Sequence, residues 1–155
     1  MRTEERLDAI DLKILSELQA DGRIQNNALA DRVGISPPPC LRRVRRLIEH
    51  KFIKSIRAIV DAKMLGYDVV SFVSVQLDAQ SDSALKSFED VVKSSPDIQQ
   101  CWLLSGDNDY ILRCVSKNIS EMQSLILSFS VMPGVRNVKS SLVLDEVKDA
   151  PLPIR

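Results

Sequence analysis

Seven cationic side chains lie within residues 42–57 of this 155-residue sequence, where Glu49 is the single acidic residue. They are Arg42, Arg43, Arg45, Arg46, Lys51, Lys54 and Arg57. Cations at this density neutralise phosphate groups and release the counterions that surround a nucleic acid. Guanidinium groups can also bond the O6 and N7 atoms of guanine with two parallel donors. The segment therefore indicates binding to a polyanion, although a helix with a merely solvated basic face has the same composition.

The charge of the whole sequence conceals this segment, because 21 Lys and Arg residues balance 21 Asp and Glu residues. Residues 1–62 hold 12 cationic and 9 acidic residues, whereas residues 63–155 hold 9 and 12. Only charges near the phosphates release counterions, so local density counts for more than the total. A nucleic acid is therefore expected to bind the first part of the chain.

An amphipathic helix over residues 37–50 is expected to position four of the arginines. Its apolar side chains fall on one side at helical spacing. They are Leu41, Val44, Leu47 and Ile48. Arg42 and Arg46 stand opposite this apolar stripe, and Arg43 and Arg45 flank them. The stripe can pack on other helices while the guanidinium groups point outward.

Two shorter helices are expected before this one. Residues 7–20 repeat apolar side chains at helical spacing, and Asn26 or Asn27 can cap a short second helix. Small Ala30 in that second helix allows close packing, and Gly34 follows where a turn requires a positive φ. Three helices joined in this way predict a helix-turn-helix, whose last helix enters the major groove of DNA.

The start of the last helix is also expected to lie close to DNA, because recognition helices usually present that end to the bases. Ser36 can cap the helix, and Pro37 fits a first turn whose N–H groups have no partner within the helix. The residues predicted to contact DNA are therefore Ser36, Pro38, Pro39, Arg42, Arg43, Arg45 and Arg46.

The rest of the chain alternates strands and helices. Residues 52–60 are typical of a short strand or wing, and a connector follows at 62–68. The order is then β-α-β-β-α-β, with expected ranges 69–77, 82–95, 98–105, 109–116, 119–130 and 135–144. The predicted fold class is α+β: a winged helix-turn-helix domain over residues 1–61, then a ferredoxin-like sandwich over residues 69–155.

Gly106, Asp107 and Asn108 join two of the expected strands, and two interpretations stay open. Gly, Asp and Asn are the residues that a tight hairpin turn requires. A free amino acid would also fit here. Asp107 and Asp109 could accept hydrogen bonds from its ammonium group, and N–H groups beside Gly106 could hold its carboxylate. Apolar residues such as Leu103 could shape a pocket for its side chain.

Several segments, taken in order, resemble one known family. They are Leu7-Asp8-x-x-Asp11-x-x-Ile14-Leu15, Asp21-Gly22-Arg23, Val33-Gly34-Ile35-Ser36-Pro37-x-Pro39-Cys40-Leu41-x-Arg43-Val44-x-Arg46-Leu47, Ser105-Gly106-Asp107-x-Asp109-Tyr110, Pro133-Gly134-Val135 and Glu146-Val147-Lys148. The ordered set covers nearly the whole chain and resembles the Lrp/AsnC (feast/famine) transcriptional regulators.

The resemblance implies a winged helix-turn-helix followed by a ligand-sensing ferredoxin-like domain. It also implies homodimers, which in this family often assemble into octamers, and an amino-acid effector bound between subunits near residues 105–110. The effector site expected on this basis comprises Leu103, Ser105, Gly106, Asp107, Asp109 and Tyr110.

The sequence gives little support for an enzyme, a metal-binding protein or a membrane protein. The sequence has neither a Gly-rich phosphate loop followed by Lys nor a nucleophile elbow, so no enzyme is expected. His50 and three cysteines, Cys40, Cys101 and Cys114, lack the spacing of a zinc site, and no metal or cofactor is expected beyond the effector. Neither a membrane-spanning apolar run nor a signal peptide is evident, so no membrane partner and a cytoplasmic location are expected.

These observations predict a dimeric transcriptional regulator that binds specific sequences of double-stranded DNA and responds to a small effector, an amino acid. One alternative is an architectural DNA-binding protein that responds to no effector. Another is a small-molecule enzyme or binding module whose basic helix is only part of its surface.

Overall fold

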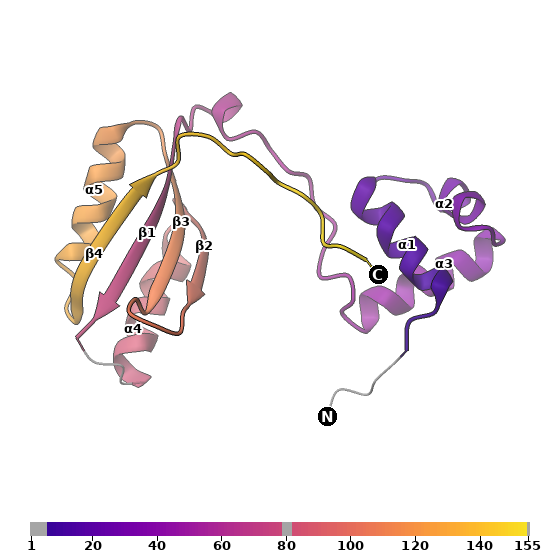
Figure 1. Ribbon diagram of the computed structural model, residues 1–155, viewed down its shortest axis with the longest axis horizontal. Coiled ribbons are helices and arrows are strands. Elements are labelled where there is room, and N and C mark those ends of the chain that lie inside the picture. Colours follow the sequence, from indigo (N-terminus) through magenta and orange to yellow (C-terminus); the bar gives the residue numbers. More distant parts are fainter. Residues whose placement is uncertain (1–5, 79–81, 155) are drawn as a thin grey trace. The chain divides into compact units, whose positions relative to one another are not determined.

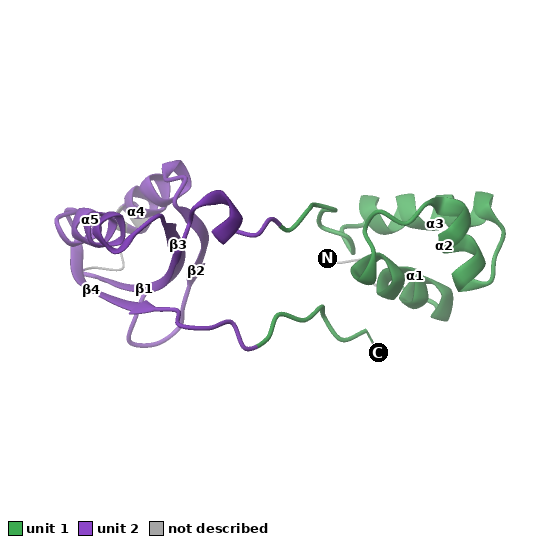
Figure 2. Ribbon diagram, turned by 90° about the horizontal axis from the view of Figure 1, so that it is seen from above, with its two compact units in different colours: residues 1–59, 148–155 green, residues 60–147 purple. Residues whose placement is uncertain are grey.

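The computed structural model describes residues 6–78 and 82–154 of the chain. The chain forms two units, each with its own hydrophobic core. Residues 1–59 together with 148–155 form the first unit, and residues 60–147 form the second (Figure 2).

The first unit contains three helices (Figure 1). They are α1 (Ala9–Ala20), α2 (Asn26–Val33) and α3 (Pro37–Glu49). They share a core in which Ile14 of α1, Leu29 of α2 and Leu47 of α3 are buried. The predicted run of three helices is therefore formed. Of the predicted apolar stripe of α3, Leu47 and Val44 pack in the core, whereas Leu41 and Ile48 are 39% and 41% exposed.

Local backbone chemistry sets the ends of these helices. The Asp8 carboxylate caps α1 by accepting hydrogen bonds from the N–H groups of Ile10 and Asp11, and the Asp11 carboxylate accepts one from the Asp8 N–H. Gly34 ends α2 with a φ of 77°, as the expected turn requires. Three prolines occupy the first turn of α3, where a missing N–H costs no helical hydrogen bond.

Two local predictions are wrong. Gln25 is the N-cap residue of α2, whereas Asn26 is its first helical residue and donates a side-chain hydrogen bond of 2.9 Å to the Pro37 carbonyl. Residues 52–60 form no strand with any other described segment. β-branched residues favour an extended backbone, but a strand also needs the hydrogen bonds of a neighbour.

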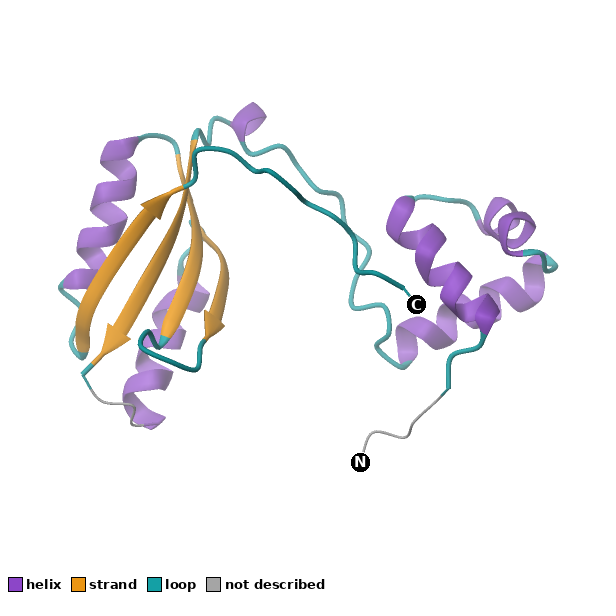
Figure 3. Cartoon of the chain, in the orientation of Figure 1, coloured by secondary structure: helices purple, strands orange, loops and turns teal. Residues whose placement is uncertain are grey.

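The second unit follows the expected order β-α-β-β-α-β (Figure 3). After a short 3-10 helix (Lys63–Leu65), its elements are β1 (Val69–Leu77), α4 (Asp82–Ser94), β2 (Ile98–Leu103), β3 (Tyr110–Ser116), α5 (Ile119–Ser130) and β4 (Val135–Leu142). The strands form one antiparallel sheet in the order β2-β3-β1-β4. Both helices cover the same face, which is the ferredoxin-like arrangement (Figure 1).

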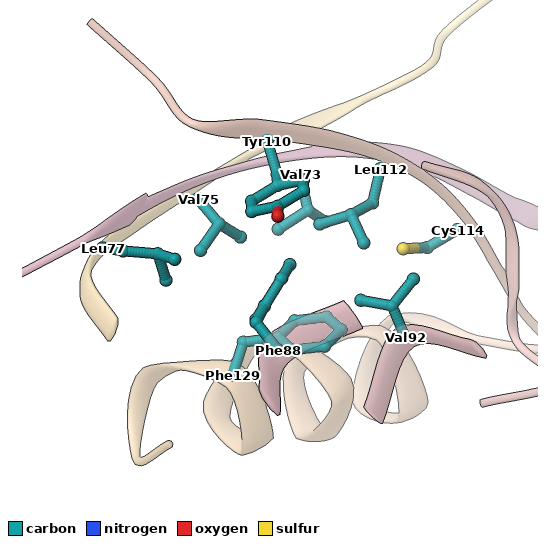
Figure 4. Packing of buried hydrophobic residues seen from close by; sticks show 9 residues of the cluster. All are labelled: Val73, Val75, Leu77, Phe88, Val92, Tyr110, Leu112, Cys114 and Phe129. Carbon is teal, nitrogen blue, oxygen red and sulfur yellow. The ribbon is translucent and has the colours of Figure 1, made fainter. Parts of the chain in front are cut away.

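Alternation along β1 divides its side chains between the two faces of the sheet. Val73, Val75 and Leu77 point toward the helices and meet Phe88 of α4 and Phe129 of α5 (Figure 4). The Phe88 and Phe129 rings lie 6.3 Å apart between centroids. This buried apolar layer is the core of the second unit.

The opposite face of the sheet carries the alternate residues of β1, with Phe72 at its middle. Phe72 is paired with Arg113 of β3 on one side and with Ser141 of β4 on the other. Within the described part of this unit, no helix covers this face (Figure 3). The sheet therefore has one packed face and one open face.

The segment from Lys148 to Ile154 belongs to the first unit, and its Leu152 bonds the end of α1. The side-chain amide of Gln19 donates a hydrogen bond to the Leu152 carbonyl and accepts one from the Leu152 N–H, both at 3.0 Å. The two units are therefore covalently connected twice, once after Ile59 and once before Lys148 (Figure 2).

Candidate DNA-binding and effector sites

Arg42 and Arg45 are the exposed arginines of α3. Neither forms an ion pair with another residue within the described ranges 6–78 and 82–154. The apolar side of the same helix is seated in the core, where Leu47 has no exposed surface. The helix thus offers two hydrated guanidinium groups to a polyanion while its other side holds the fold together.

Arg43 and Arg46, one turn apart on α3, pair with acidic residues at the start of α1. Arg43 lies 2.7 Å from the Asp8 carboxylate and 2.8 Å from that of Asp11, and Arg46 lies 2.5 Å from Asp11. The sequence placed Arg46 opposite the apolar stripe and pointing outward beside Arg42. In the structure Arg46 instead forms an ion pair with Asp11. Asp11 is only 1% exposed, and a buried carboxylate needs cationic partners to compensate for its lost hydration.

The pKa values of Asp8 and Arg43 are both shifted toward the charged forms. The hydrogen bond from the Asp11 N–H, followed by the Arg43 guanidinium, lowers the pKa of Asp8. The hydrogen bonds to Asp8 and then to Asp11 raise the pKa of Arg43. Both groups therefore stay ionised at neutral pH, and the connection between α1 and α3 persists there.

The first turn of α3 directly precedes these arginines in the helix. Ser36 has the extended backbone of an N-cap residue, but its side chain makes no capping hydrogen bond. Ser36 and Pro38 are exposed, and Pro39 is partly exposed. One turn further, Arg42, Arg43 and Arg46 line a shallow hollow of about 160 Å³. All seven residues expected to contact DNA therefore belong to one continuous stretch of α3 and its cap. Arg43 and Arg46 are ion-paired with α1, whereas Arg42 and Arg45 are exposed.

The loop between β2 and β3 spans residues 104–109 and is held by main-chain and side-chain bonds. The Leu104 N–H bonds the Asp109 carbonyl at 2.8 Å. The Asp109 carboxylate, which is 7% exposed, accepts a 2.7 Å hydrogen bond from the Leu77 N–H. The Gln76 amide donates to the Asp107 carbonyl. Asp109 therefore anchors the loop to the end of β1.

The other expected effector residues divide between the loop surface and the core. Leu103, Ser105, Gly106 and Asp107 are exposed. Tyr110 is 2% exposed, because its ring lies on the helix-covered face, 4.8 Å from the Phe88 ring between centroids (Figure 4). The structure brings the four exposed residues together and places the Tyr110 ring beneath α4.

Two further features bear on what the protein can do. Within the described residues, no group of three or more His, Cys, Asp or Glu side chains is arranged to hold a metal ion. Of the helices that the structure describes, none is both long enough and apolar enough to cross a membrane.

Two family models match the chain. A winged helix-turn-helix DNA-binding model matches residues 7–54, and the model of the Lrp/AsnC ligand binding domain matches residues 70–153. The chain belongs to the Lrp/AsnC family. It is a transcriptional regulator with a DNA-binding domain and a ligand-binding domain.

Relatives agree with this assignment over most of their length. The leucine-responsive regulatory protein of Rhizobium meliloti is 48% identical over 145 residues, which are 93% of each chain. That of Escherichia coli K12 is 39% identical over 93% of this chain and 88% of its own. These proteins are transcription regulators, as the sequence predicted for this chain.

Solved structures confirm the predicted fold class. A transcriptional regulator of Neisseria meningitidis in complex with L-Met superposes with a TM-score of 0.90 at 31% identity, over 96% of this chain and 97% of its own. An AsnC family regulator of Agrobacterium tumefaciens superposes with a TM-score of 0.87 at 32% identity, over 95% and 97%.

Sequence reasoning missed the partners of several site residues in this Lrp/AsnC regulator. Asp8 and Asp11 were expected only as part of a family motif, and Gln76 and Glu89 were not expected at all. Two carboxylates three residues apart ahead of a helix do signal a capping box. Nothing in the spacing signals their arginine partners, which lie 32 to 35 residues away.

Replacing Tyr110 by Phe is expected to remove an alkaline pH dependence from the ligand-binding domain. Burial, followed by the hydrogen bond to Glu89, raises the pKa of Tyr110 to about 12. Because the folded pKa exceeds the unfolded one, the stabilisation is complete below about pH 10 and is lost as the pH rises toward 12. The expected loss is about 2 kcal/mol.

Urea unfolding between about pH 8 and pH 12 measures this difference. The free energy of unfolding should fall more steeply for the wild type than for Tyr110→Phe. Tyr67→Phe, outside the sheet, is the matched control and should follow the wild type. Identical slopes for wild type and Tyr110→Phe would show that Tyr110 ionises as readily in the folded protein as in the unfolded chain.

Proposed function

We propose that this regulator acts in the cytoplasm as a homodimer that binds specific DNA sequences through two copies of α3. A free amino acid, bound at the loop between β2 and β3, controls how the subunits assemble. The observation that carries the proposal is the exposed basic side of α3, in a domain of known DNA-binding type. In a dimer, two such helices would enter successive major grooves about one helical turn apart on a pseudo-palindromic site.

An amino-acid effector is supported by the solved relative from Neisseria meningitidis, which contains L-Met, and by the chemistry of the loop. Asp107 is exposed and can accept hydrogen bonds from an ammonium group. Gly106 has a φ of 131° and no side chain, so the backbone N–H groups beside it are open to a carboxylate. Exposed Leu103 adds an apolar contact. A second subunit would be needed to enclose such a ligand.

The open face of the sheet supports the homodimer. Phe72 and Trp102 lie on this face, and Trp102 of β2 is 43% exposed. Apolar side chains in the middle of an uncovered sheet favour packing against an identical face. An exposed Leu127 on α5, at 63%, is available for contacts between dimers in an octamer.

The experiment compares DNA binding and thermal stability with each of the twenty amino acids. Genomic footprinting should recover specific sites, and one or a few amino acids should change the pattern. A specific ligand at about 100 times its Kd should stabilise the protein by about 2.7 kcal/mol and raise its Tm by several degrees. An effector alters assembly only if it binds two assemblies unequally, so sedimentation velocity should change with the same amino acids.

Asp107→Asn serves as the loss variant, and Asp90→Asn, an exposed change on α4, serves as its control. The rise in Tm should disappear in the first and remain in the second. If none of the twenty amino acids shifts the Tm or the footprint, the protein is an architectural DNA-binding protein without an effector. If no DNA fragment is bound even at low salt, the DNA-binding proposal itself fails.

A further inference from the structure

Asp11 is the most buried acidic side chain among the described residues of the DNA-binding unit, and both of its carboxylate oxygens accept hydrogen bonds from arginines of α3. Its Oδ1 accepts a hydrogen bond from Arg43 at 2.8 Å, and its Oδ2 accepts one from Arg46 at 2.5 Å. The side chain is 1% exposed, whereas the paired arginines are 25% and 38% exposed. One carboxylate of α1 therefore engages two of the four guanidinium groups of α3.

We infer that Asp11 is a positioning residue for DNA recognition, which withholds Arg43 and Arg46 from phosphates so that Arg42 and Arg45 read the DNA. The inference rests on the proposed function of α3 and deepens it. Asp8 assists, because its carboxylate lies 2.7 Å from Arg43 and also caps α1.

The energetics of a buried ion pair favour this arrangement. If Arg43 or Arg46 turned to a phosphate, it would leave the carboxylate of Asp11 without that partner in a place that water does not reach. A phosphate contact made by exposed Arg42 or Arg45 carries no such cost, because these side chains form no ion pair within the described residues. Arg42 and Arg45 should therefore make the contacts to DNA.

The charges lead to the same conclusion. Four guanidinium groups on one helix would bind any DNA strongly, because phosphate contacts carry no sequence information. Asp8 and Asp11 neutralise two of these charges at the helix itself. Non-specific affinity is thereby lowered more than specific affinity, which also draws on contacts to bases. The carboxylates thus contribute to specificity by limiting the number of arginines available to phosphates.

The test measures binding of the full chain to two duplexes over a range of salt concentrations. One duplex is recovered by genomic footprinting, and the other has the same length and a shuffled sequence. Asp11→Asn should release arginines to phosphates, so the slope of log K against log salt should steepen by about 1 to 2. Affinity for the shuffled duplex should rise about 5- to 50-fold at 0.1 M salt, and the ratio of specific to shuffled affinity should fall.

Glu17→Gln is the matched control, because Glu17 is a carboxylate of α1 that pairs with Arg32 of α2 instead of with α3. It removes the same charge and should leave both slope and ratio near the wild-type values. A carboxylate that only held the fold together would give the opposite result for Asp11→Asn, namely weaker binding to both duplexes. An unchanged or shallower slope for Asp11→Asn overturns the inference.

If Asp11→Asn shows no cooperative melting, a second comparison decides. Arg42→Gln and Arg43→Gln remove neighbouring guanidinium groups from the same helix. The inference predicts that Arg42→Gln lowers the slope by about 0.9, whereas Arg43→Gln leaves it unchanged. Equal losses from both variants overturn it. A wild type that binds neither duplex would instead refute the proposed function, so the two failures are distinguishable.

Discussion

Replacing Arg42 and Arg45 together by alanine is expected to weaken binding to a specific site by about 10- to 1,000-fold. Both side chains are exposed on α3, and they are the guanidinium groups of that helix that no described carboxylate engages. Each phosphate contact that is lost lowers the salt slope by about 0.9, and each bidentate contact to guanine that is lost costs about 1 to 3 kcal/mol.

Fluorescence anisotropy with a labelled duplex, between about 0.05 and 0.2 M salt, measures both the affinity and the slope. Lys86→Ala with Lys93→Ala is a suitable control, because it removes two cations from α4 of the ligand-binding domain. The control should bind like the wild type. If the arginine variant kept its affinity and its slope, α3 would not be the DNA-binding element, and the assignment of the first unit would have to be revised.

Phe72→Lys is expected to dissociate the proposed homodimer and, with it, most DNA binding. Phe72 lies at the middle of the open sheet face, paired with Arg113 of β3 and two residues from Ser74, which is opposite Lys139 of β4. A lysine there would bring a third cation, with no acidic partner, into an interface between two copies of the same face. The dimer should weaken by at least about 100-fold, since removal of a buried aromatic and burial of an unpaired charge act together.

Loss of the dimer separates the two DNA-binding domains, so the second one no longer binds at the high effective concentration that a shared assembly provides. The expected loss of affinity is about 100- to 10,000-fold. Sedimentation velocity and anisotropy on the same samples link the two effects. Leu127→Lys, on the exposed side of α5, is the control and should remain dimeric. A Phe72→Lys variant that stays dimeric and binds DNA normally would exclude the open face as the dimer interface.

The helix-turn-helix could be predicted from sequence because its determinants are local. Gly34 at a positive φ and the three prolines at the start of α3 define where one helix ends and the next begins, and both features are visible in a stretch of six residues. The strands and helices of residues 69–142 could be predicted for the same reason, because each is visible in its own short stretch of sequence. Each element shows its own period, and the order of elements restricts the fold to few topologies.

The pairing of α1 with α3 could not be predicted in this way. Helical periodicity assigns Arg43 and Arg46 to a face of α3, but it contains no information on which other element lies against that face. Tyr110 illustrates a related limit. A motif placed it with the loop, whereas its register in β3, opposite Val75, turns its ring to the core. A shift of one residue in a strand reverses the face, and only the paired sheet fixes it.

Residues 52–60 show why composition alone was insufficient to predict a strand. Their β-branched side chains favour an extended backbone, but Phe52 and Ile53 lie in a bend and residues 54–60 have no regular secondary structure. Whether such a segment becomes a strand depends on a partner strand that pairs with it, and no described segment pairs with residues 52–60. Ile53 instead packs on the core of the helix-turn-helix.

The bond between Gln19 and Leu152 makes the ligand-binding domain an insertion within the DNA-binding unit instead of an appendage to it. The chain passes between the two units twice, after Ile59 and before Lys148. From β1 to α3 it runs through covalent bonds alone, whereas the connection from β4 to α1 depends on the two hydrogen bonds between Leu152 and Gln19. A variant without the Gln19 amide would keep the first connection and lose the second.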